Sequence, residues 1–222
     1  MIYYRYSDQQ LESKAEELLQ RFDPERLYKA KPIDVYAVVE KCLGVPYDWK
    51  YLTPDQSILG MTLFKAGYLW VWPKPYYEEG MLPYKAEYEA NTILIDSTLT
   101  ESEQRGPENF TVMHETFHQV LHRRCFLHCN PDYTHASSKA ALTGQRRGMT
   151  ALDINERQAN FCAATFLMPR QLLTDTFRKL YPSGMISLES DGAYRIIKVL
   201  SEDFSVSPFA MKYRLQYLHL AD

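Results

Sequence analysis

The sequence predicts an α+β protein in which a small antiparallel sheet packs on helices. Apolar residues recur at helical spacing in residues 8–44 and again through most of the second half of the chain. Short runs rich in β-branched and aromatic residues gather between these two helical parts. The chain of 222 residues fits one domain, 1–222. We expect N-terminal helices in 1–44, the sheet and two central helices in 45–168, and a C-terminal helical part in 169–222.

The N-terminal part predicts two helices. Residues 8–21 carry an amphipathic stripe, which Asp23-Pro24 terminates. A second helix begins near Pro32, and Gly44 is its expected stop.

The middle of the chain predicts strands joined by turns. A glycine turn at Ala66-Gly67 separates two of them, and residues 73–88 are predicted to form a loop because prolines and glycines stand among charges there. The expected strands are 45–52, 58–65, 68–72 and 92–95.

The second half predicts five helices. The first has Pro107 in its first turn and Asn109 as a candidate N-cap, and no glycine or proline interrupts it from 108 to 124. Its apolar stripe includes Phe110, Met113 and Phe117. The other helices are expected around 152–164, 169–180, 191–204 and 207–218, the last with Ser207-Pro208 at its start.

The most informative motif is His114-Glu115-Thr116-Phe117-His118. Histidines four positions apart share one helical face with Cβ atoms about 5–6 Å apart, a span that lets both rings reach one zinc ion. Glu115 lies between them and is the candidate general base for a water at the metal. The alternative is a helix with two ordinary histidines, but the adjacent apolar stripe places both rings near the edge of the core.

A catalytic zinc site needs a third protein ligand. Glu156 is the best candidate, because it lies in a second predicted helix with small residues that permit close packing. Asn160 follows one turn later on the same face and is expected to hydrogen-bond a ligand histidine. Without the His-Glu-x-x-His motif, Glu156 would be interpreted as an ordinary surface glutamate.

These two motifs resemble the ImmA/IrrE metallopeptidases. Their pattern is a His-Glu-x-x-His helix followed by Glu-x-x-Ala-Asn-x-Phe-Ala and an apolar run ending in Met-Pro, as in residues 156–169 here. The resemblance implies a gluzincin-like, zincin-type peptidase domain with C-terminal helices. It implies Zn²⁺ held by His114, His118 and Glu156, with Glu115 as general base. It further implies cleavage of a helix-turn-helix transcriptional repressor, which relieves repression.

Two other functions stay open. One is a non-catalytic metal-binding module that binds a repressor without turnover. The other is a DNA-binding regulator, which is not expected because the chain has a net charge of −3 and few basic residues after Ser187. The sequence does not separate zinc from manganese, because metal supply also decides occupancy.

An extended peptide substrate can add to the edge of a sheet. The predicted strand just before the metal helix is our candidate for that edge, formed by Asn91, Thr92, Ile93, Leu94 and Ile95. The aromatic residues of the first 90 positions, such as Tyr68 and Trp70, are expected to be half-buried sheet residues, with an apolar peptide subsite as the alternative. Candidates for an oxyanion donor are Tyr133, His135 and Tyr194, and the sequence does not choose among them.

The segment between the two motifs departs from the family pattern. It contains His122, Cys125, His128, Cys129 and His135, which could form a second metal site or a redox pair. The alternative is a helix end followed by a solvated loop, since no standard zinc spacing is present.

The chain is expected to be cytoplasmic. Its N-terminus lacks the apolar segment of a signal peptide, and no apolar run approaches the ~20 residues that span a bilayer. Four cysteines without secretory features fit a reducing compartment.

Overall fold

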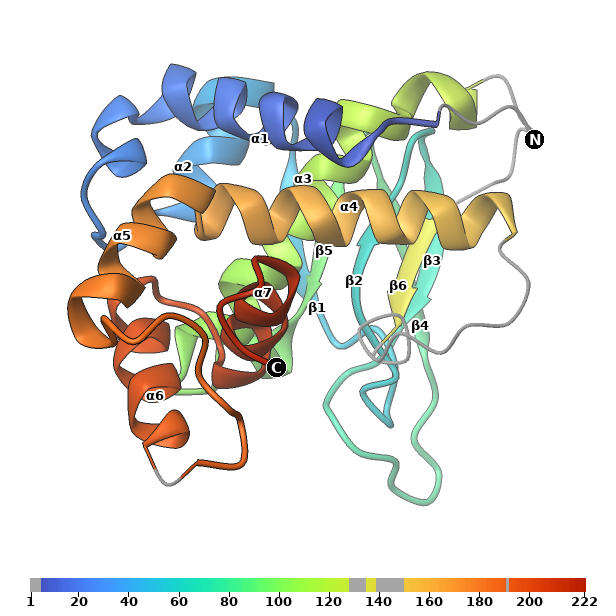
Figure 1. Ribbon diagram of the computed structural model, residues 1–222. Helices are drawn as coiled ribbons and strands as arrows, with labels where there is room; N and C mark the ends of the chain where they lie inside the picture. Colours follow the sequence, from blue (N-terminus) through green and yellow to red (C-terminus); the bar gives the residue numbers. More distant parts are fainter. Residues whose placement is uncertain (1–4, 128–134, 139–149, 191) are drawn as a thin grey trace.

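The structure, a computed structural model, describes residues 5–127, 135–138, 150–190 and 192–222, with the backbone alone for 135–138. Its described part combines helices with two small sheets, so the predicted α+β class is confirmed. Figure 1 shows the strands gathered at one side of the molecule and the C-terminal helices at the other, with a long central helix crossing between them. None of the described helices has both the length and the apolar character needed to span a bilayer.

Helix α1 (Asp8–Phe22) forms close to where its amphipathic stripe predicts. Ser7 and Gln10 cap its start reciprocally, each side chain accepting from the other's backbone N–H. A 3₁₀ turn follows at Pro24–Leu27. The second helix is α2 (Val35–Val38), which continues as a π-type turn over Val39–Leu43. Gly44 ends it with a φ of +62°, a left-handed conformation that suits glycine.

The larger sheet is mixed. Its described strands are β1 (Tyr47–Lys50), β2 (Ile58–Thr62), β5 (Ile93–Asp96) and β6 (His135–Ser138), in the order β1-β5-β2-β6. Strand β5 pairs antiparallel with β2 but parallel with β1. Among the described strand pairs, the antiparallel expectation therefore holds for all except β1–β5, where a long excursion through β2, β3 and β4 leaves room for a parallel return.

Strands β3 (Gly67–Val71) and β4 (Tyr84–Tyr88) form a separate antiparallel pair. The prediction of loop throughout 73–88 is therefore wrong at its end. Strand β4 reads Tyr-Lys-Ala-Glu-Tyr, which has weak strand character, and it forms because β3 supplies its hydrogen-bond partners.

Two long helices form the centre of the fold. Helix α3 (Arg105–Leu127) packs on β2 and β5 with one side and on helix α4 (Ala151–Leu167) with another. Helix α1 packs alongside α4, and Figure 1 shows these two helices running side by side. The main core lies among these helices and the sheet, and includes Phe117 and Phe166, both fully buried.

The C-terminal helices are α5 (Arg170–Leu180), α6 (Ala193–Asp203) and α7 (Pro208–Tyr217), close to their predicted bounds. A short 3₁₀ turn at Ser97–Leu99 precedes α3. Buried Arg214 of α7 joins this part to the rest of the fold. Its guanidinium donates to the Met168 carbonyl oxygen over 3.2 Å and to Glu12 Oε1 over 3.2 Å. The Met168-Pro169 ending of α4 is thus held by both terminal regions.

Candidate metal centre

Helix α3 carries the His-Glu-x-x-His motif in its buried middle. The helix begins at Arg105, so Pro107 lies in its first turn as predicted. Asn109 lies inside the helix, and the N-cap prediction for it is wrong. Its amide donates to the Ser205 carbonyl oxygen over 2.9 Å, which ties α3 to the turn between α6 and α7. The motif is therefore anchored at its N-terminal end by the C-terminal helices.

Three side chains converge where α3 faces α4. His114 Nε2 and His118 Nε2 lie 2.9 Å apart. Glu156 of α4 places Oε2 3.3 Å from His114 Nε2 and Oε1 3.4 Å from His118 Nε2. Both imidazoles are buried, and the Glu156 side chain is 16% exposed. The two motifs, about 40 positions apart in the chain, thus form one cluster.

The donor set fits a divalent metal. Bonds of about 2.0–2.1 Å in a tetrahedral zinc site place ligand atoms about 3.3 Å apart. The two separations from Glu156 are close to this value, and the two Nε2 atoms lie somewhat nearer to each other, at 2.9 Å. Two neutral imidazoles and a carboxylate also match the ligand types of catalytic zinc. Within the described residues, this is the one group of three or more histidine, cysteine and acidic side chains close enough to share an ion.

The electrostatics of the cluster also favour a cation. Burial alone would lower the pKa of His114, but the hydrogen bond and charge of Glu156, together with the charge of Glu115, outweigh it and the pKa is raised. The same carboxylates that hold a proton on this ring would stabilise a metal ion, so protons and metal compete for one place.

Glu115 lies next to the cluster and is held from the sheet. The Thr62 hydroxyl of β2 donates to Glu115 Oε2 over 2.6 Å. Gly60 makes this approach possible, because a Cβ atom there would lie 2.8 Å from Glu115 Oε1 and 2.8 Å from Thr111 Cγ2. Neither Thr62 nor Gly60 was identified from the sequence, since threonine and glycine in a strand carry no signal of such a role.

The Nδ1 atoms of His114 and His118 each lie within hydrogen-bonding distance of another side chain. His114 Nδ1 lies 2.8 Å from Asn160 Oδ1, the partner that the sequence predicted. His118 Nδ1 lies 2.9 Å from Nδ1 of His122, whose Nε2 is 3.1 Å from Gln158 Oε1. Gln158 was not identified from the sequence.

The possible second metal or redox site is not tested. His122 takes part in the contacts just described, and Cys125 is buried. His128 and Cys129 lie outside the described residues, as does Tyr133, and the side chain of His135 is not described.

The prediction that a peptide binds along β5 is wrong. Strand β5, with the adjoining Asn91 and Thr92, was to receive a substrate strand through Ile93, Leu94 and Ile95. Instead β5 pairs with β1 on one side and β2 on the other, and each of its four residues is buried. A strand saturated on both sides has no backbone groups left for a peptide. Its uniformly apolar run Ile-Leu-Ile is typical of an internal strand.

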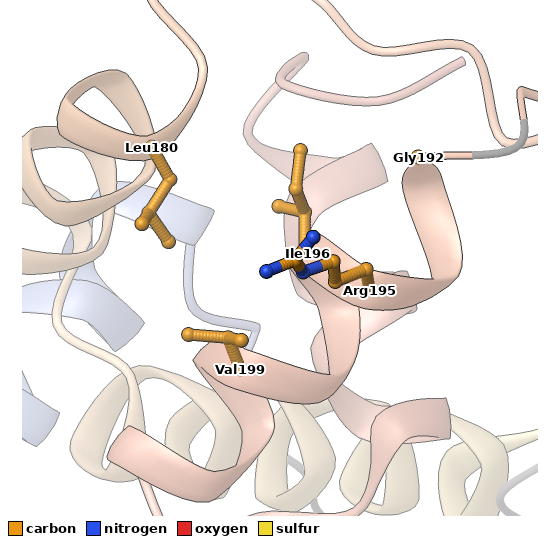
Figure 2. A pocket seen from close by; sticks show the side chains of 5 residues that line it. All are labelled: Leu180, Gly192, Arg195, Ile196 and Val199. Atoms are coloured by element: carbon orange, nitrogen blue, oxygen red, sulfur yellow. The ribbon is translucent and has the colours of Figure 1, made fainter.

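Other features lie apart from the cluster. Tyr68 and Trp70 of β3 are 53% and 59% exposed, more than the half-buried state expected. Tyr194 is 70% exposed on α6, where no described contact joins it to the histidines. A cavity of about 370 Å³ lies between α5 and α6, lined by Leu180, Gly192, Arg195, Ile196 and Val199 (Figure 2). None of these residues belongs to the metal cluster.

A family model covers this part of the chain. The profile of Peptidase_M78, described as the IrrE N-terminal-like domain, matches residues 77–216. Among proteins with curated descriptions, none matches the sequence. A solved structure described as a Mycobacterium tuberculosis transcriptional regulator is 12% identical, with a TM-score of 0.48 over 93% of this chain and 46% of its own. The present chain thus spans less than half of that protein.

Proposed function

The chain belongs to the Peptidase_M78 family, and from that premise we propose that it is a zinc-dependent endopeptidase that cleaves a helix-turn-helix transcriptional repressor. One observation carries the catalytic part: His114, His118 and Glu156 converge within hydrogen-bonding distances, with Glu115 beside them. The protein-substrate part is what the family implies. The choice of a repressor rests on the resemblance of the motifs to ImmA/IrrE proteins.

His114, His118 and Glu156 would hold the ion. Bound zinc would supply a Lewis acid that polarises the scissile carbonyl and lowers the pKa of water toward ~7. With three protein ligands, the ion would remain open to a substrate or water oxygen. The two buried histidines also exclude bulk water from their side of the site.

Glu115 would act as the proton carrier. Its carboxylate would accept a proton from the attacking water and pass it to the leaving amide nitrogen. The Thr62 hydroxyl holds Glu115 Oε2 through a hydrogen bond, and Glu115 Oε1 lies beside Gly60 of the same strand. Because Glu115 Oε2 is held from the sheet, its position does not depend on the substrate.

The peptide would bind along β6. In the described part of the sheet β6 is an outer strand, with β2 on its inner side, and β2 carries the Thr62 that contacts Glu115. A substrate strand paired with β6 would therefore join the sheet that holds Glu115, two strands away from β2.

The test is whether zinc-loaded protein cleaves a purified helix-turn-helix repressor encoded by the same genome. Wild type is expected to cleave it. Glu115→Gln is expected to keep its zinc and lose cleavage, whereas the exposed control Glu103→Gln is expected to cleave normally. A fully active Glu115→Gln variant would overturn the mechanism. A stable complex of zinc-loaded wild type with uncleaved repressor would instead support the non-catalytic binding module.

A further inference from the structure

A row of buried hydrogen bonds runs outward from His118, away from the proposed metal position. Its Nδ1 lies 2.9 Å from His122 Nδ1, and His122 Nε2 lies 3.1 Å from Gln158 Oε1. The exposed fractions of His118, His122 and Gln158 are 0%, 0% and 2%. Proton positions along this row are therefore set by neighbouring side chains and not by bulk water.

With Gln158 Oε1 facing His122 and both rings neutral, these two contacts have one proton assignment. An amide oxygen only accepts, so a neutral His122 must carry its proton on Nε2 and donate it to Gln158. His122 Nδ1 is then an acceptor, and His118 must donate from Nδ1. In that tautomer the lone pair of His118 lies on Nε2, the atom 3.4 Å from Glu156 Oε1.

The tautomer of His114 is fixed in the same way, but by a single hydrogen bond. In the neutral ring, Asn160 Oδ1 accepts from His114 Nδ1 over 2.8 Å, which leaves the lone pair of His114 on Nε2. Asn160 and Gln158 both belong to α4, as does Glu156. One short segment of α4 thus supplies the carboxylate and both amide oxygens.

We propose that His122 and Gln158 are positioning residues that fix the tautomer and ring orientation of His118, so that its Nε2 is ready to bind the metal. This inference rests on the proposed metal site. We call the row of hydrogen bonds His118–His122–Gln158 the relay. It explains why a third buried histidine on α3, one turn beyond the motif, contacts a ligand histidine through Nδ1. Turning the Gln158 amide over would reverse each proton and place a hydrogen on His118 Nε2, which blocks metal binding.

Zinc affinity of Gln158 variants is the first measurement, by competition with a chromophoric chelator. Gln158→Met keeps the length but removes the acceptor, and we expect it to weaken zinc binding about 10–100-fold. Gln158→Glu keeps an acceptor oxygen and is expected to retain the wild-type affinity. Gln119→Met is the matched control, because it removes another buried glutamine, one that donates to the Asn91 carbonyl oxygen over 2.9 Å outside the relay.

The ring tautomer of His122 is the second measurement, by nitrogen-15 NMR of labelled protein with and without zinc. We expect the Nε2–H form in both states of the wild type, and a loss of that preference in Gln158→Met. An Nδ1–H form in the wild type would overturn the relay, as would unchanged zinc affinity in Gln158→Met. Wild type that takes up no zinc would refute the proposed metal site, while the tautomer would still decide the hydrogen-bond relay.

Discussion

The Thr62 hydroxyl donates a 2.6 Å hydrogen bond to Oε2 of Glu115, and so links the sheet to the proposed catalytic carboxylate. Both residues are fully buried. The contact joins β2 to α3 at the one glutamate between the two motif histidines. It fixes the carboxylate against rotation without using either histidine, which makes its role separable from metal binding.

Replacing Thr62 by valine is expected to slow cleavage by about 10–100-fold. The change removes a hydrogen bond to a charged group, worth about 1.5–3 kcal/mol, and keeps the branched shape of the side chain. The measurement is kcat/KM for repressor cleavage together with zinc content, which should not change. Thr62→Ser keeps the hydroxyl and serves as the control. Thr62→Val with wild-type kcat/KM would show that this hydrogen bond does not position Glu115.

Gly60→Ala is expected to destabilise the fold by about 1–3 kcal/mol, because the added methyl would overlap Glu115 Oε1 and Thr111 Cγ2, each 2.8 Å away. In a chain of this size each kcal/mol lowers Tm by about 2–4 °C. Gly67→Ala is the matched control, since nothing lies within 4 Å of a Cβ atom at that position. Thermal unfolding of both variants checks the prediction. Equal melting temperatures would mean that β2 does not need glycine to approach α3.

The thiol of Cys162 is expected to resist alkylation in the folded protein. Burial raises its pKa to about 12, and its Sγ donates to the Leu11 carbonyl oxygen over 3.4 Å. The reactive thiolate is therefore scarce at pH 8. Peptide mapping after brief treatment with iodoacetamide should find Cys42, which is partly exposed, modified well before Cys162. Equal labelling of the two cysteines in native protein would contradict the packing of α1 on α4. Labelling of Cys162 only after denaturation would support that packing.

The contact between Asp8 and Arg157 is expected to contribute pH-dependent stability. Burial alone would raise the pKa of Asp8, but hydrogen bonds from Arg157 and Tyr217 outweigh it and lower the pKa. A carboxyl whose folded pKa is depressed stabilises the fold above its unfolded pKa of about 3.9, and that contribution disappears as pH falls through the folded pKa.

Asp8→Asn should therefore lower the free energy of unfolding by less than about 1 kcal/mol at pH 7, since both partners are partly exposed. Near pH 2 the substitution should leave that free energy almost unchanged. Denaturant unfolding of wild type and variant across this range gives the difference directly. A difference in unfolding free energy that stays constant with pH would exclude a role for the Asp8 charge.

The sequence predicted local elements well because their signals are local. The periodicity of α1, the left-handed Gly44 and the cap at Ser207 each act within one or two turns. Strands were harder, because pairing is decided by distant partners. Nothing local in Tyr84–Tyr88 indicates that β3 lies beside it, and nothing in Ile93–Asp96 states that β1 returns in parallel.

The residues of the site differ in the same way: those linked by local spacing were predicted, and those that local spacing does not link were not. Spacing brought together His114, His118 and Glu115, and helical spacing from Glu156 reached Asn160. Gln158 was missed because it is two positions from Glu156, about 200° around an ideal helix, and periodicity does not group the two. Thr62 was missed because only the docking of β2 on α3 brings it to Glu115.

Elemental analysis of protein purified without added metal tests the metal centre most directly. Wild type and the exposed control Glu202→Ala are expected to carry about one zinc ion per chain, and Glu156→Ala is expected to lose most of it, because two histidines alone bind zinc weakly. A wild type that holds no metal even after reconstitution would contradict the proposed centre. Full zinc occupancy in Glu156→Ala would show that the ion is held by a ligand set other than His114, His118 and Glu156.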